Sequence, residues 1–569
     1  MNEQKRNFLI LMLICVVTIL PFLGAADYYS KGEPREAVVA YSMLETGNWV
    51  LPTNYGGDIA FKPPFFHWSI AVVSSLFGGV SEGSSRLPSA LALIVMALAL
   101  YAFYARRKAA WTALLAACVT LTCFEVHRAG FACRVDMVLT AFIVLALLQF
   151  YRWCEHNQKG VPWLAVLFMG CAVLTKGPVG IILPCFVTGV FLWIRDGKFW
   201  QPCWKLAGIA LLACVIPGVW YALAYRQGGD AFLDLMMEEN FGRFLGKMSY
   251  ESHENPVSYN FIMLFAGWLP WTLLALFSLF SWRYRKPEGR LREVAARTWT
   301  AFRRWNDVDL FSFLSIVLIF LFYCIPASKR SVYLLPIYPF IGYFLAVYFR
   351  VLLQKGKRSV AAFGVFMTAA MALLTLTFVA LQCGWVPDTV FSGKRAAENI
   401  AFLHALGGIS WHIGVLCLVL LPIAATCCFW RLRKRGADDG RQLLALCGIL
   451  FTLFMALDGL YQPAVLGVKS DKPLAAKVKE WAPEGAVYSY GPAYFYGVNF
   501  YNGNRMTFFE RSQPQEGVLL VGERREKELL ENYGNDYEFT EIYRSTLRSC
   551  DIRDIVVAFR FRKKQLPGL

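Results

Sequence analysis

The sequence has little charge for its length. Asp, Glu, Lys and Arg make up only 17% of its 569 residues, compared with about 25% in soluble globular proteins. So little charge excludes a disordered chain, a coiled coil and an ordinary cytosolic enzyme. Hydrophobic residues make up 57% of the chain, and its mean hydropathy is +0.44. The composition therefore predicts an integral membrane protein that crosses the bilayer many times.

The sequence also lacks the residue patterns of a metal site. It has six histidines, no Cys-x-x-Cys pair and no Cys/His spacing typical of zinc ligands. Almost all of its 16 cysteines fall in apolar runs, where cysteine acts as a small hydrophobic residue. Cys550 is the single cysteine after residue 462. We therefore expect no metal site and no internal disulfide in the C-terminal segment.

Apolar runs of about 17–25 residues, long enough to cross a bilayer as helices, recur along the chain. Residues 176–177 form a short gap between two of these runs, which indicates a tight turn. The runs predict thirteen membrane spans, at residues 8–25, 86–105, 109–126, 137–153, 160–175, 177–194, 205–224, 259–282, 309–326, 332–353, 359–382, 409–430 and 442–461.

The net charge of +17 gives the orientation of these spans. If the N-terminus is cytoplasmic, Lys and Arg gather in alternate connections, as the positive-inside rule requires. These connections include residues 106–108, 283–304, 355–358 and 431–441. The excess of positive charge therefore reflects topology and does not indicate nucleic-acid binding. An odd number of spans places the segment after residue 462 on the opposite, outer side of the membrane.

The segment 463–569 is expected to form a separate domain, after a membrane domain at 1–462. It is no longer continuously apolar, and it alternates short strand-like runs with helix-like ones. This pattern predicts a small α/β domain on the outer side. The runs are Ala486–Tyr490, Gly517–Val521 and Ile555–Phe561 for strands, and Lys472–Trp481 and Arg524–Asn532 for helices.

The N-terminal span has an alternative interpretation. Lys5 and Arg6, the apolar stretch after them and Gly24-Ala25-Ala26 are similar to a cleaved signal peptide. The apolar stretch is long enough to span the bilayer, so we expect a retained span. Cleavage would not change the side on which the later segments lie.

Three connections on the outer side are long, at residues 26–85, 225–258 and 384–408. Long connections in compact proteins are often functional, which favours a site at the outer membrane interface. The apolar stretch 65–79 in the first connection is too short to span comfortably, so it is predicted to lie in the interface. The first connection also contains charged residues against the membrane surface, namely Asp27, Glu33, Arg35, Glu36 and Lys62. Alternatively, these charges cap helices and the aromatic residues form an interfacial belt.

Further polar residues lie at the outer ends of predicted spans. Each has a structural alternative: Asp136 could pair with Arg134 or Arg128, and Lys176 could extend its ammonium to the interface. A lone histidine is also usually structural. The candidates are Asp136, Lys176, Lys329, Arg330 and Tyr333, with Arg243 and His253 in the second long connection.

These residue types together could catalyse group transfer from a lipid phosphate. Cations could bind the phosphate and stabilise it as it leaves, and a carboxylate could take a proton from an attacking hydroxyl. The same groups equally suit a phospholipid-binding site without chemistry. Composition and position leave both interpretations open.

The order of several motifs resembles a known family. The motifs are Glu33-Pro34-Arg35-Glu36-Ala37, Gly47-Asn48-Trp49-Val50, Lys62-Pro63-Pro64, Asp136-Met137, Leu174-Thr175-Lys176-Gly177, the 239–256 loop and Ser328-Lys329-Arg330 to Pro336. They resemble bacterial glycosyltransferases related to the lipid A aminoarabinose transferases and, more distantly, the protein O-mannosyltransferases, all of the GT-C superfamily. The resemblance covers about residues 1–350. It implies a membrane protein of about thirteen helices with a C-terminal domain in the periplasm.

The resemblance also implies substrates and roles. The donor would be an undecaprenyl-phosphate sugar in a bacterial inner membrane, and the acceptor would be lipid A or another envelope molecule. Glu33 and Asp136 would be catalytic, while the donor phosphate would be held by Arg35, Lys62, Lys329 and Arg330. The secondary candidates are Asp27, Lys176, Arg243, His253 and Tyr333. No residue is assigned to a metal, although a divalent cation stays open.

Two positions differ from the family pattern. Gly32 stands where the family often has an acid, so Glu33 must take that role or Asp27 must supply it. Phe61 stands where the aminoarabinose transferases often have an acid before Lys-Pro-Pro. These differences bear on the sugar and on the acceptor.

The leading hypothesis is a monomeric membrane glycosyltransferase that moves a sugar, such as 4-amino-4-deoxy-L-arabinose, to lipid A. Inversion is expected because a single displacement needs no enzyme nucleophile. The close alternative is a protein or surface-polysaccharide acceptor. A flippase or transporter would need ionisable residues in mid-span and repeated broken helices, and the sequence shows neither. A protein that binds lipid without chemistry is a third alternative.

Overall fold

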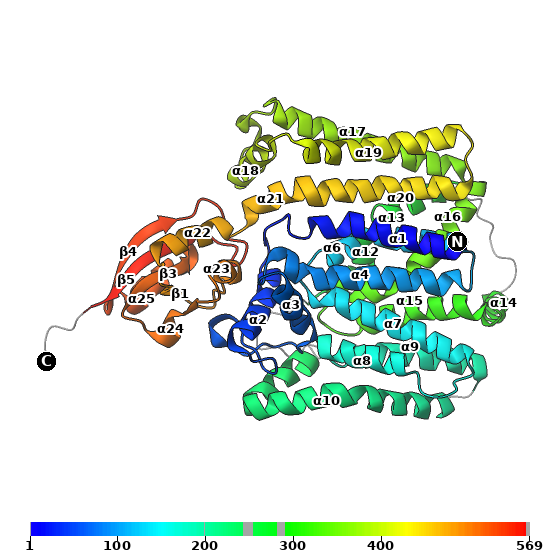
Figure 1. The fold of residues 1–569 in the computed structure, drawn as a ribbon, viewed down its shortest axis with the longest axis horizontal. Helices are drawn as coiled ribbons and strands as arrows, with labels where there is room; N and C mark the ends of the chain where they lie inside the picture. The colour runs from blue at the N-terminus through cyan, green and yellow to red at the C-terminus, as the bar shows by residue number, and fades with distance from the viewer. Residues whose placement is uncertain (1, 198–199, 243–253, 282–290, 565–569) are drawn as a thin grey trace.

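The computed structural model describes residues 2–197, 200–242, 254–281 and 291–564. Figure 1 shows a bundle of roughly parallel helices with a sheet-containing part at one end and the N-terminus at the other. A bilayer offers no water to bond to the backbone, so each apolar run must satisfy its own N–H and C=O groups. Helix formation does this, which explains why the apolar runs fold as they do.

Ten helical segments in the described chain are long and apolar enough to cross a membrane. Their main helices are α1 (Glu3–Ile19), α4 (Glu82–Ala105), α7 (Val135–Glu155), α9 (Val179–Asp196), α10 (Trp200–Met237), α15 (Asp307–Cys324), α16 (Tyr338–Lys355), α17 (Lys357–Gln382), α19 (Ile413–Lys434) and α20 (Asp439–Ala456). The predicted class, a polytopic helical membrane protein, is confirmed.

Two further predicted spans are pairs of helices joined at a sharp bend. The axes of α5 (Ala110–Leu121) and α6 (Phe124–Gly130) differ by 71°, and those of α12 (Val257–Gly267) and α13 (Trp271–Leu279) by 97°. The predicted span 160–175 corresponds to α8 (Trp163–Lys176), an apolar helix of only 14 residues. The ten long segments, the two bent pairs and α8 together account for the thirteen predicted runs.

The first long connection folds into two helices against the end of the bundle. α2 (Gly32–Thr46) has Glu33 and Pro34 in its first turn, where a carboxylate and a proline suit the helix dipole and the free N–H groups. It ends at Gly47, whose φ of +71° is the left-handed conformation that glycine adopts without strain. α3 (Phe65–Leu76) is the predicted interfacial helix. Figure 1 shows α2 and α3 at the end of the bundle that faces the sheet.

The C-terminal part is a five-stranded sheet with helices around it. The strand order is β2-β1-β3-β5-β4; β1 pairs in parallel with β2 and β3, while β5 is antiparallel to β3 and β4. The predicted strands and helices of this segment are all present. The elements are α22 (Lys472–Trp481), β1 (Val487–Ser489), α23 (Tyr496–Tyr501), β2 (Thr507–Phe508), α24 (Phe509–Ser512), β3 (Glu516–Gly522), α25 (Glu523–Tyr533), β4 (Tyr537–Arg544) and β5 (Val556–Lys563).

The last span leads directly to the sheet. α20 continues through the π-helix η6 (Leu457–Tyr461) into α21 (Gln462–Lys469), so the expected division at residue 462 falls within one long helix and stays a prediction. Other helices between the spans include α14 (Leu291–Arg303), α18 (Ala396–Gly407) and the 3-10 helix η4 (Ser331–Ile337) before α16.

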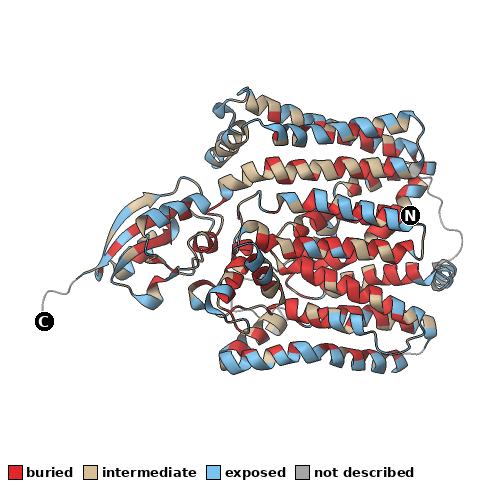
Figure 2. Cartoon of the chain, in the orientation of Figure 1, coloured by how far each residue is buried: buried red, intermediate tan, exposed pale blue. Residues whose placement is uncertain are grey.

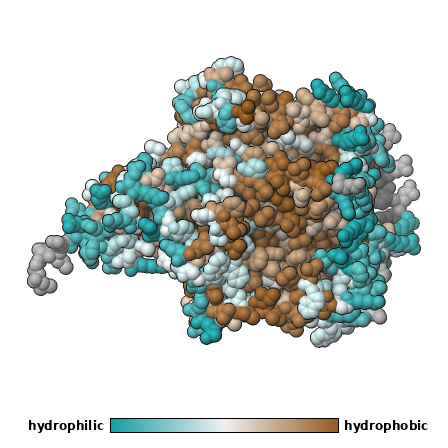
Figure 3. Space-filling view, in the orientation of Figure 1, coloured by the Kyte–Doolittle hydropathy of each residue, from teal (hydrophilic) through white to brown (hydrophobic). Residues whose placement is uncertain are grey.

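The packed core lies among the central helices of the bundle. Figure 2 shows buried residues concentrated on α4 and α7, whereas α10, α17 and α19 expose one side. In Figure 3, apolar residues form a band across the visible face of the bundle, with hydrophilic residues at its right-hand edge and on the sheet-containing part. An apolar outer surface of this kind is expected where helices face lipid. The band ends near α2 and α3, where the charged candidates gather.

Candidate functional site

The charged candidates converge at the bundle end that carries α2 and α3. Helix ends supply most of them: the first turn of α2, the residue before α7, the last residue of α8 and the turn before η4. Because these ends meet at one level of the bundle, residues far apart in sequence come together there. The described members are Glu33, Arg35, Glu36, Lys62, Arg134, Asp136, Lys176, Lys329 and Arg330.

Glu33 lies in a buried ion pair. Arg86 donates to Glu33 Oε1 through Nε at 2.9 Å and to Oε2 through Nη2 at 3.3 Å, and the Cys133 N–H donates to Oε1 at 3.0 Å. Arg86 also donates to the Leu23 and Ala26 carbonyl oxygens. Both carboxylate oxygens are thus held by a guanidinium, a geometry that fixes α2 on α4. The catalytic role of Glu33 stays a prediction, and the geometry favours a positioning role.

Glu36, one turn further along α2, is the centre of a second buried cluster. It is only 2% exposed and accepts hydrogen bonds from Arg35 Nη2 at 3.0 Å and from Lys62. Its Oε2 lies 2.9 Å from His67 Nε2. The structure therefore brings the predicted Arg35 and Lys62 together, around a carboxylate that the sequence analysis treated only as a helix-terminal charge. The signal was available: Glu33 and Glu36 are three residues apart and share a helix face.

The charges in this cluster depend on one another. Burial alone would raise the pKa of Glu36, but Lys62, Arg35 and His67 hold it well below its usual range. Burial lowers the pKa of Lys62 to about 8, although Glu36 opposes this change. At neutral pH, Glu36 is therefore an ionised carboxylate and Lys62 is protonated. Lys62 loses its proton as the pH rises above about 8.

Phe61, which replaces an acid of the family pattern, covers this cluster. Its ring centroid lies 4.8 Å from the Arg35 guanidinium carbon and 5.6 Å from Lys62 Nζ. An aromatic face attracts cations without neutralising them. The substitution therefore leaves these two cations with Glu36 as the carboxylate that binds them in the described chain.

Asp136 pairs with Lys176. The ammonium donates to Asp136 Oδ1 and also lies 4.4 Å from the Tyr333 ring centroid. The expected alternatives, a pair between Asp136 and Arg134 or Arg128, are wrong for the described chain, because Arg128 pairs instead with Glu125 at 2.7 Å. Three predicted residues, Asp136, Lys176 and Tyr333, thus form one group at the ends of α7, α8 and η4.

Arg134 and Arg330 differ from every cation above. Both are half-buried, and neither guanidinium has a hydrogen bond or an ion pair with any described residue. Burial, with Arg330 and Arg35 close by, lowers the pKa of Arg134. Two arginines that repel each other at the edge of a membrane indicate a site for an anion. Arg134 was considered earlier only as a partner for Asp136.

Gly32 makes room for Arg134. A Cβ atom added at position 32 would collide with the Arg134 guanidinium, so any side chain there would displace it. The glycine that departs from the family pattern therefore determines where a cation sits. Gly32 stands where the family often has an acid. In the structure, the Arg134 guanidinium occupies the space that a side chain at this position would fill.

Of the remaining candidates, the two that the structure describes take part in none of the ion pairs above. Lys329 is buried and donates to the Pro326 carbonyl oxygen at 2.6 Å, so its ammonium is turned toward the backbone. Asp27 pairs with Lys472 at 2.6 Å and thus joins the first connection to α22. Arg243 and His253 lie outside the described residues. The roles predicted for all four stay predictions.

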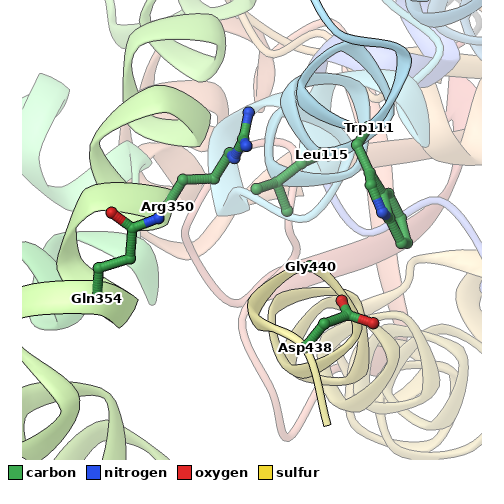
Figure 4. Close-up of a pocket in the computed structure, with 6 residues that line it drawn as sticks. All are labelled: Trp111, Leu115, Arg350, Gln354, Asp438 and Gly440. Carbon is green, nitrogen blue, oxygen red and sulfur yellow. The ribbon is translucent and has the colours of Figure 1, made fainter.

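A cavity of about 320 Å³ lies at the other end of the bundle (Figure 4). It is lined by Trp111 and Leu115 of α5, Arg350 and Gln354 of α16, and Asp438 and Gly440 at the start of α20. Arg350 lies twelve residues into α16, about 18 Å from its start, and η4 with Arg330 precedes that start. Arg350 donates to Thr112 Oγ1 at 2.7 Å. This cavity is therefore separate from the charged site.

Comparison with known proteins identifies relatives. The family described as dolichyl-phosphate-mannose-protein mannosyltransferase matches residues 61–221. An undecaprenyl phosphate-alpha-4-amino-4-deoxy-L-arabinose arabinosyl transferase of Erwinia tasmaniensis is 27% identical over 429 residues, 73% of each chain. One of Shewanella sediminis is 29% identical over 289 residues, 48% of this chain and 50% of that protein.

A solved structure shares the whole fold. ArnT from Cupriavidus metallidurans, crystallised with undecaprenyl phosphate, has a TM-score of 0.69 to this chain, with 19% identity and 97% of each chain covered. The same protein without ligand gives a TM-score of 0.67. The match extends over the bundle and the C-terminal part alike, so the fold is shared along the chain. The sequence and fold comparisons confirm the expected resemblance to membrane glycosyltransferases of the GT-C type, which include the aminoarabinose transferases and the protein mannosyltransferases.

Proposed function

We propose that this protein transfers a sugar from an undecaprenyl-phosphate carrier to an envelope acceptor in the bacterial inner membrane. Its curated relatives are named for undecaprenyl-phosphate-linked aminoarabinose, and the ArnT fold has been crystallised with undecaprenyl phosphate. Lipid A is the acceptor that we favour, with a protein or a surface polysaccharide as the alternative. The reaction takes place on the periplasmic side, where the positive-inside rule places α2 and the C-terminal sheet.

The observation that carries this proposal is the pair of guanidinium groups at Arg134 and Arg330. They have no anionic partner in the described chain, and they lie beside the Lys62 and Asp136 clusters at the end of the apolar band. A phosphodiester in a lipid headgroup is an anion at this depth, and arginine binds phosphate oxygens through paired N–H groups. Arg35 Nε and His67 Nδ1 are also buried without a partner in the described residues, which adds two nitrogen atoms near the site.

The residues of the site divide into two roles. Arg134, Arg330 and Lys62 bind the donor phosphate and stabilise it when it leaves with the electrons of the sugar–oxygen bond. Glu36 and Glu33 position these cations, Glu36 by pairing with Lys62 and Glu33 by fixing α2 through Arg86. An acceptor oxygen attacks the anomeric carbon from the opposite side, which inverts its configuration.

Asp136 is the carboxylate that we assign to the acceptor. Lys176 forms an ion pair with it at the start of α7. The positive charges of Lys62 and Arg330 also interact favourably with the Asp136 carboxylate. Where the attacking oxygen carries a proton, Asp136 is positioned to receive it. An amide at this position would keep the shape of the side chain and remove this capacity.

The test is mass spectrometry of lipid A and envelope glycans from a strain that lacks this protein. The deletion is expected to remove a sugar-bearing lipid A species, and the wild-type chain should restore it. The variants Arg134→Gln and Arg330→Gln should each restore less than about a tenth, since loss of one charge-assisted phosphate contact weakens transition-state binding by roughly 1.5–3 kcal/mol.

Arg128→Gln is the matched control, because Glu125 already neutralises this nearby arginine. It removes the same charge and should restore the modification nearly fully. Unchanged lipid A beside a changed glycoprotein or polysaccharide would overturn the acceptor. Full restoration by both Arg134→Gln and Arg330→Gln would overturn the assignment of the phosphate site.

A further inference from the structure

The C-terminal part contains a second polar cluster, away from the charged site. Asp471 directly precedes α22, while Cys550 and Asp551 lie in the connection between β4 and β5. One potential ligand atom from each of the three residues can be chosen so that all three atoms lie within 4.8 Å of one another. Residues about 80 positions apart in sequence thus bring two carboxylates and a thiol to one point. The sequence predicts no metal here, because its cysteine and histidine residues lack the spacing typical of zinc ligands.

One carboxylate oxygen in this cluster lacks a partner. Asp551 is 7% exposed, and its Oδ1 is buried without a hydrogen bond from any described residue. Asp471 beside it is 6% exposed, so two carboxyl groups share a site from which water is nearly excluded. Lys31 influences Asp551 electrostatically, but no ion pair joins them in the described chain, and its ammonium lies 5.2 Å from the Tyr494 ring centroid. Such a pair requires a shared proton or a cation.

The other contacts of the cluster fix the orientation of the potential ligands. The Gly497 N–H donates to Asp551 Oδ2 at 2.6 Å, which leaves Oδ1 directed away from that bond. Ser549 Oγ donates to Asp471 Oδ2 at 2.7 Å. Hydrogen bonds of this kind, from groups that do not bind the ion themselves, are typical of the surroundings of metal ligands.

One distance between potential ligand atoms, across the hydrogen bond from the Cys550 thiol to Asp471, suits a tetrahedral ion. Cys550 Sγ lies 3.4 Å from Asp471 Oδ2. In a tetrahedral zinc site with bonds of about 2.3 Å to sulfur and about 2.1 Å to oxygen, the sulfur–oxygen edge is about 3.6 Å. A thiolate among the ligands favours zinc over magnesium or calcium, which prefer oxygen alone.

We propose that Asp471, Cys550 and Asp551 bind one Zn²⁺ ion, with Asp551 coordinating through Oδ1 and a water molecule in the fourth position. On binding, the Cys550 thiol releases its proton to solvent and coordinates as a thiolate. The ion joins the start of α22 to the β4–β5 connection and, through Gly497, to α23. α23 in turn packs on the first connection, where the rings of Phe500 and Tyr28 lie 4.9 Å apart. Zinc thus fastens the sheet to the segment that carries the site.

The test measures zinc binding by the full-length protein in detergent, freed of affinity tag and metal. A competing chelator dye is expected to report one tight zinc site per chain. Cys550→Ser and Asp551→Asn should each weaken binding at least tenfold. Co²⁺ should give a thiolate-to-metal absorption band with the wild type, and Cys550→Ser should remove that band.

Asp554→Asn is the matched control. Asp554 lies in the same connection, and its Oδ2 accepts a hydrogen bond from the Arg524 N–H at 3.1 Å. The variant therefore removes an equal charge without changing a side chain of the cluster. It should bind zinc as the wild type does. Wild-type affinity in Asp551→Asn, or a cobalt spectrum without a thiolate band, would overturn the proposal.

Thermal unfolding separates zinc binding from a shared proton. Zinc should raise the melting temperature of the wild type and of Asp554→Asn, but not that of Asp551→Asn, because only a bound ion stabilises by mass action. Without metal, Asp551→Asn should melt no lower than the wild type, since it removes a buried charge and keeps the acceptor for Gly497. If zinc leaves the wild-type melting temperature unchanged, the two carboxyl groups share a proton and the proposal fails.

Discussion

Ion pairs occur at both ends of the helical bundle, but among the described residues the pairs with both side chains buried lie at one end only. Near the N-terminus, Arg107 pairs with Glu155, whose carboxylate side chain is 35% exposed. At the α2 end, the side chains of Glu33 and Arg86 are each 4% exposed. Water screens the first pair and is excluded from the second. The number of ion pairs therefore does not distinguish the two ends. Their burial, and the presence of a cation without a described partner, do distinguish them.

The two ends also differ in how their charges balance. Lys108 and Asp309 form a further pair near the N-terminal end, at 2.9 Å and half-exposed. At the α2 end, Arg134 and Arg330 have no partner among the described residues although they are half-buried. An unpaired buried cation is unfavourable unless a ligand completes it. This difference is why we place ligand binding at the α2 end.

The largest expected effect is on stability, from the loss of one carboxylate at each end. Glu36→Gln leaves the half-buried Lys62 and Arg35 without a counter-charge, which should lower the unfolding free energy by about 3–5 kcal/mol. Glu155→Gln removes a partly exposed partner and should lower it by only about 0.2–1 kcal/mol. Unfolding in mixed micelles with increasing SDS measures both.

A double variant checks the cause. Adding Lys62→Gln to Glu36→Gln should recover part of the lost stability, because the uncompensated cation is then removed as well. Equal losses for Glu36→Gln and Glu155→Gln would show that burial does not distinguish the two ends.

The next effect concerns Gly32 and sugar transfer. Gly32→Ala should reduce transfer by about 10–100-fold, because the new Cβ displaces the Arg134 guanidinium from its place beside Arg330. Position 32 is the first residue of α2, where alanine favours the helix, so the fold should be retained. Transfer from a purified undecaprenyl-phosphate sugar to acceptor lipid measures the loss.

Gly467→Ala is the control for this substitution, since a Cβ at that helical glycine meets no atom. It should transfer sugar at the wild-type rate. If Gly32→Ala acts through Arg134, adding it to Arg134→Gln should cause no further loss. Wild-type transfer by Gly32→Ala would separate Arg134 from the donor site.

Much of the fold could be predicted from the apolar pattern. The thirteen runs correspond to described helices, and the stretch after Pro64 forms the short apolar helix α3, whose interfacial position stays a prediction. The bends in two spans could not be predicted in this way. The run 109–126 is apolar apart from its threonines and Glu125, and hydropathy does not show that Phe124 donates its N–H to the Leu269 carbonyl oxygen of another span. The short length of α8 could not be predicted either, because the residues on both sides of it are also apolar.

The site could be located from sequence, but its pairings could not. Charges on the predicted outer side indicate Lys62, Asp136 and Lys176, which the structure places at the same end of the bundle, while their roles stay predictions. Arg86 lies within the predicted span 86–105. The sequence suggests Arg134 only as a partner for Asp136. Which acid binds which base depends mostly on contacts across 26 to 53 residues, and these follow from helix packing. The single local signal that was missed is the shared face of Glu33 and Glu36.

The smallest expected effect is a pH dependence at the α2 end that an arginine at position 62 would abolish. Lys62 in the free protein has a pKa of about 8, below its ordinary value, so it is charged at pH 7 and mostly neutral at pH 9. A phosphodiester keeps its single charge over this range, and it binds the charged form of Lys62. The apparent KM for the donor should therefore rise as pH increases above about 8, by roughly tenfold at pH 9. Bound phosphate raises the pKa of Lys62, so kcat should change little over the same interval.

Lys62→Arg stays charged throughout and should give a KM that is flat from pH 7 to 9. If wild type and Lys62→Arg show the same rise in KM, another group titrates, and Lys62 does not bind the donor through its charge.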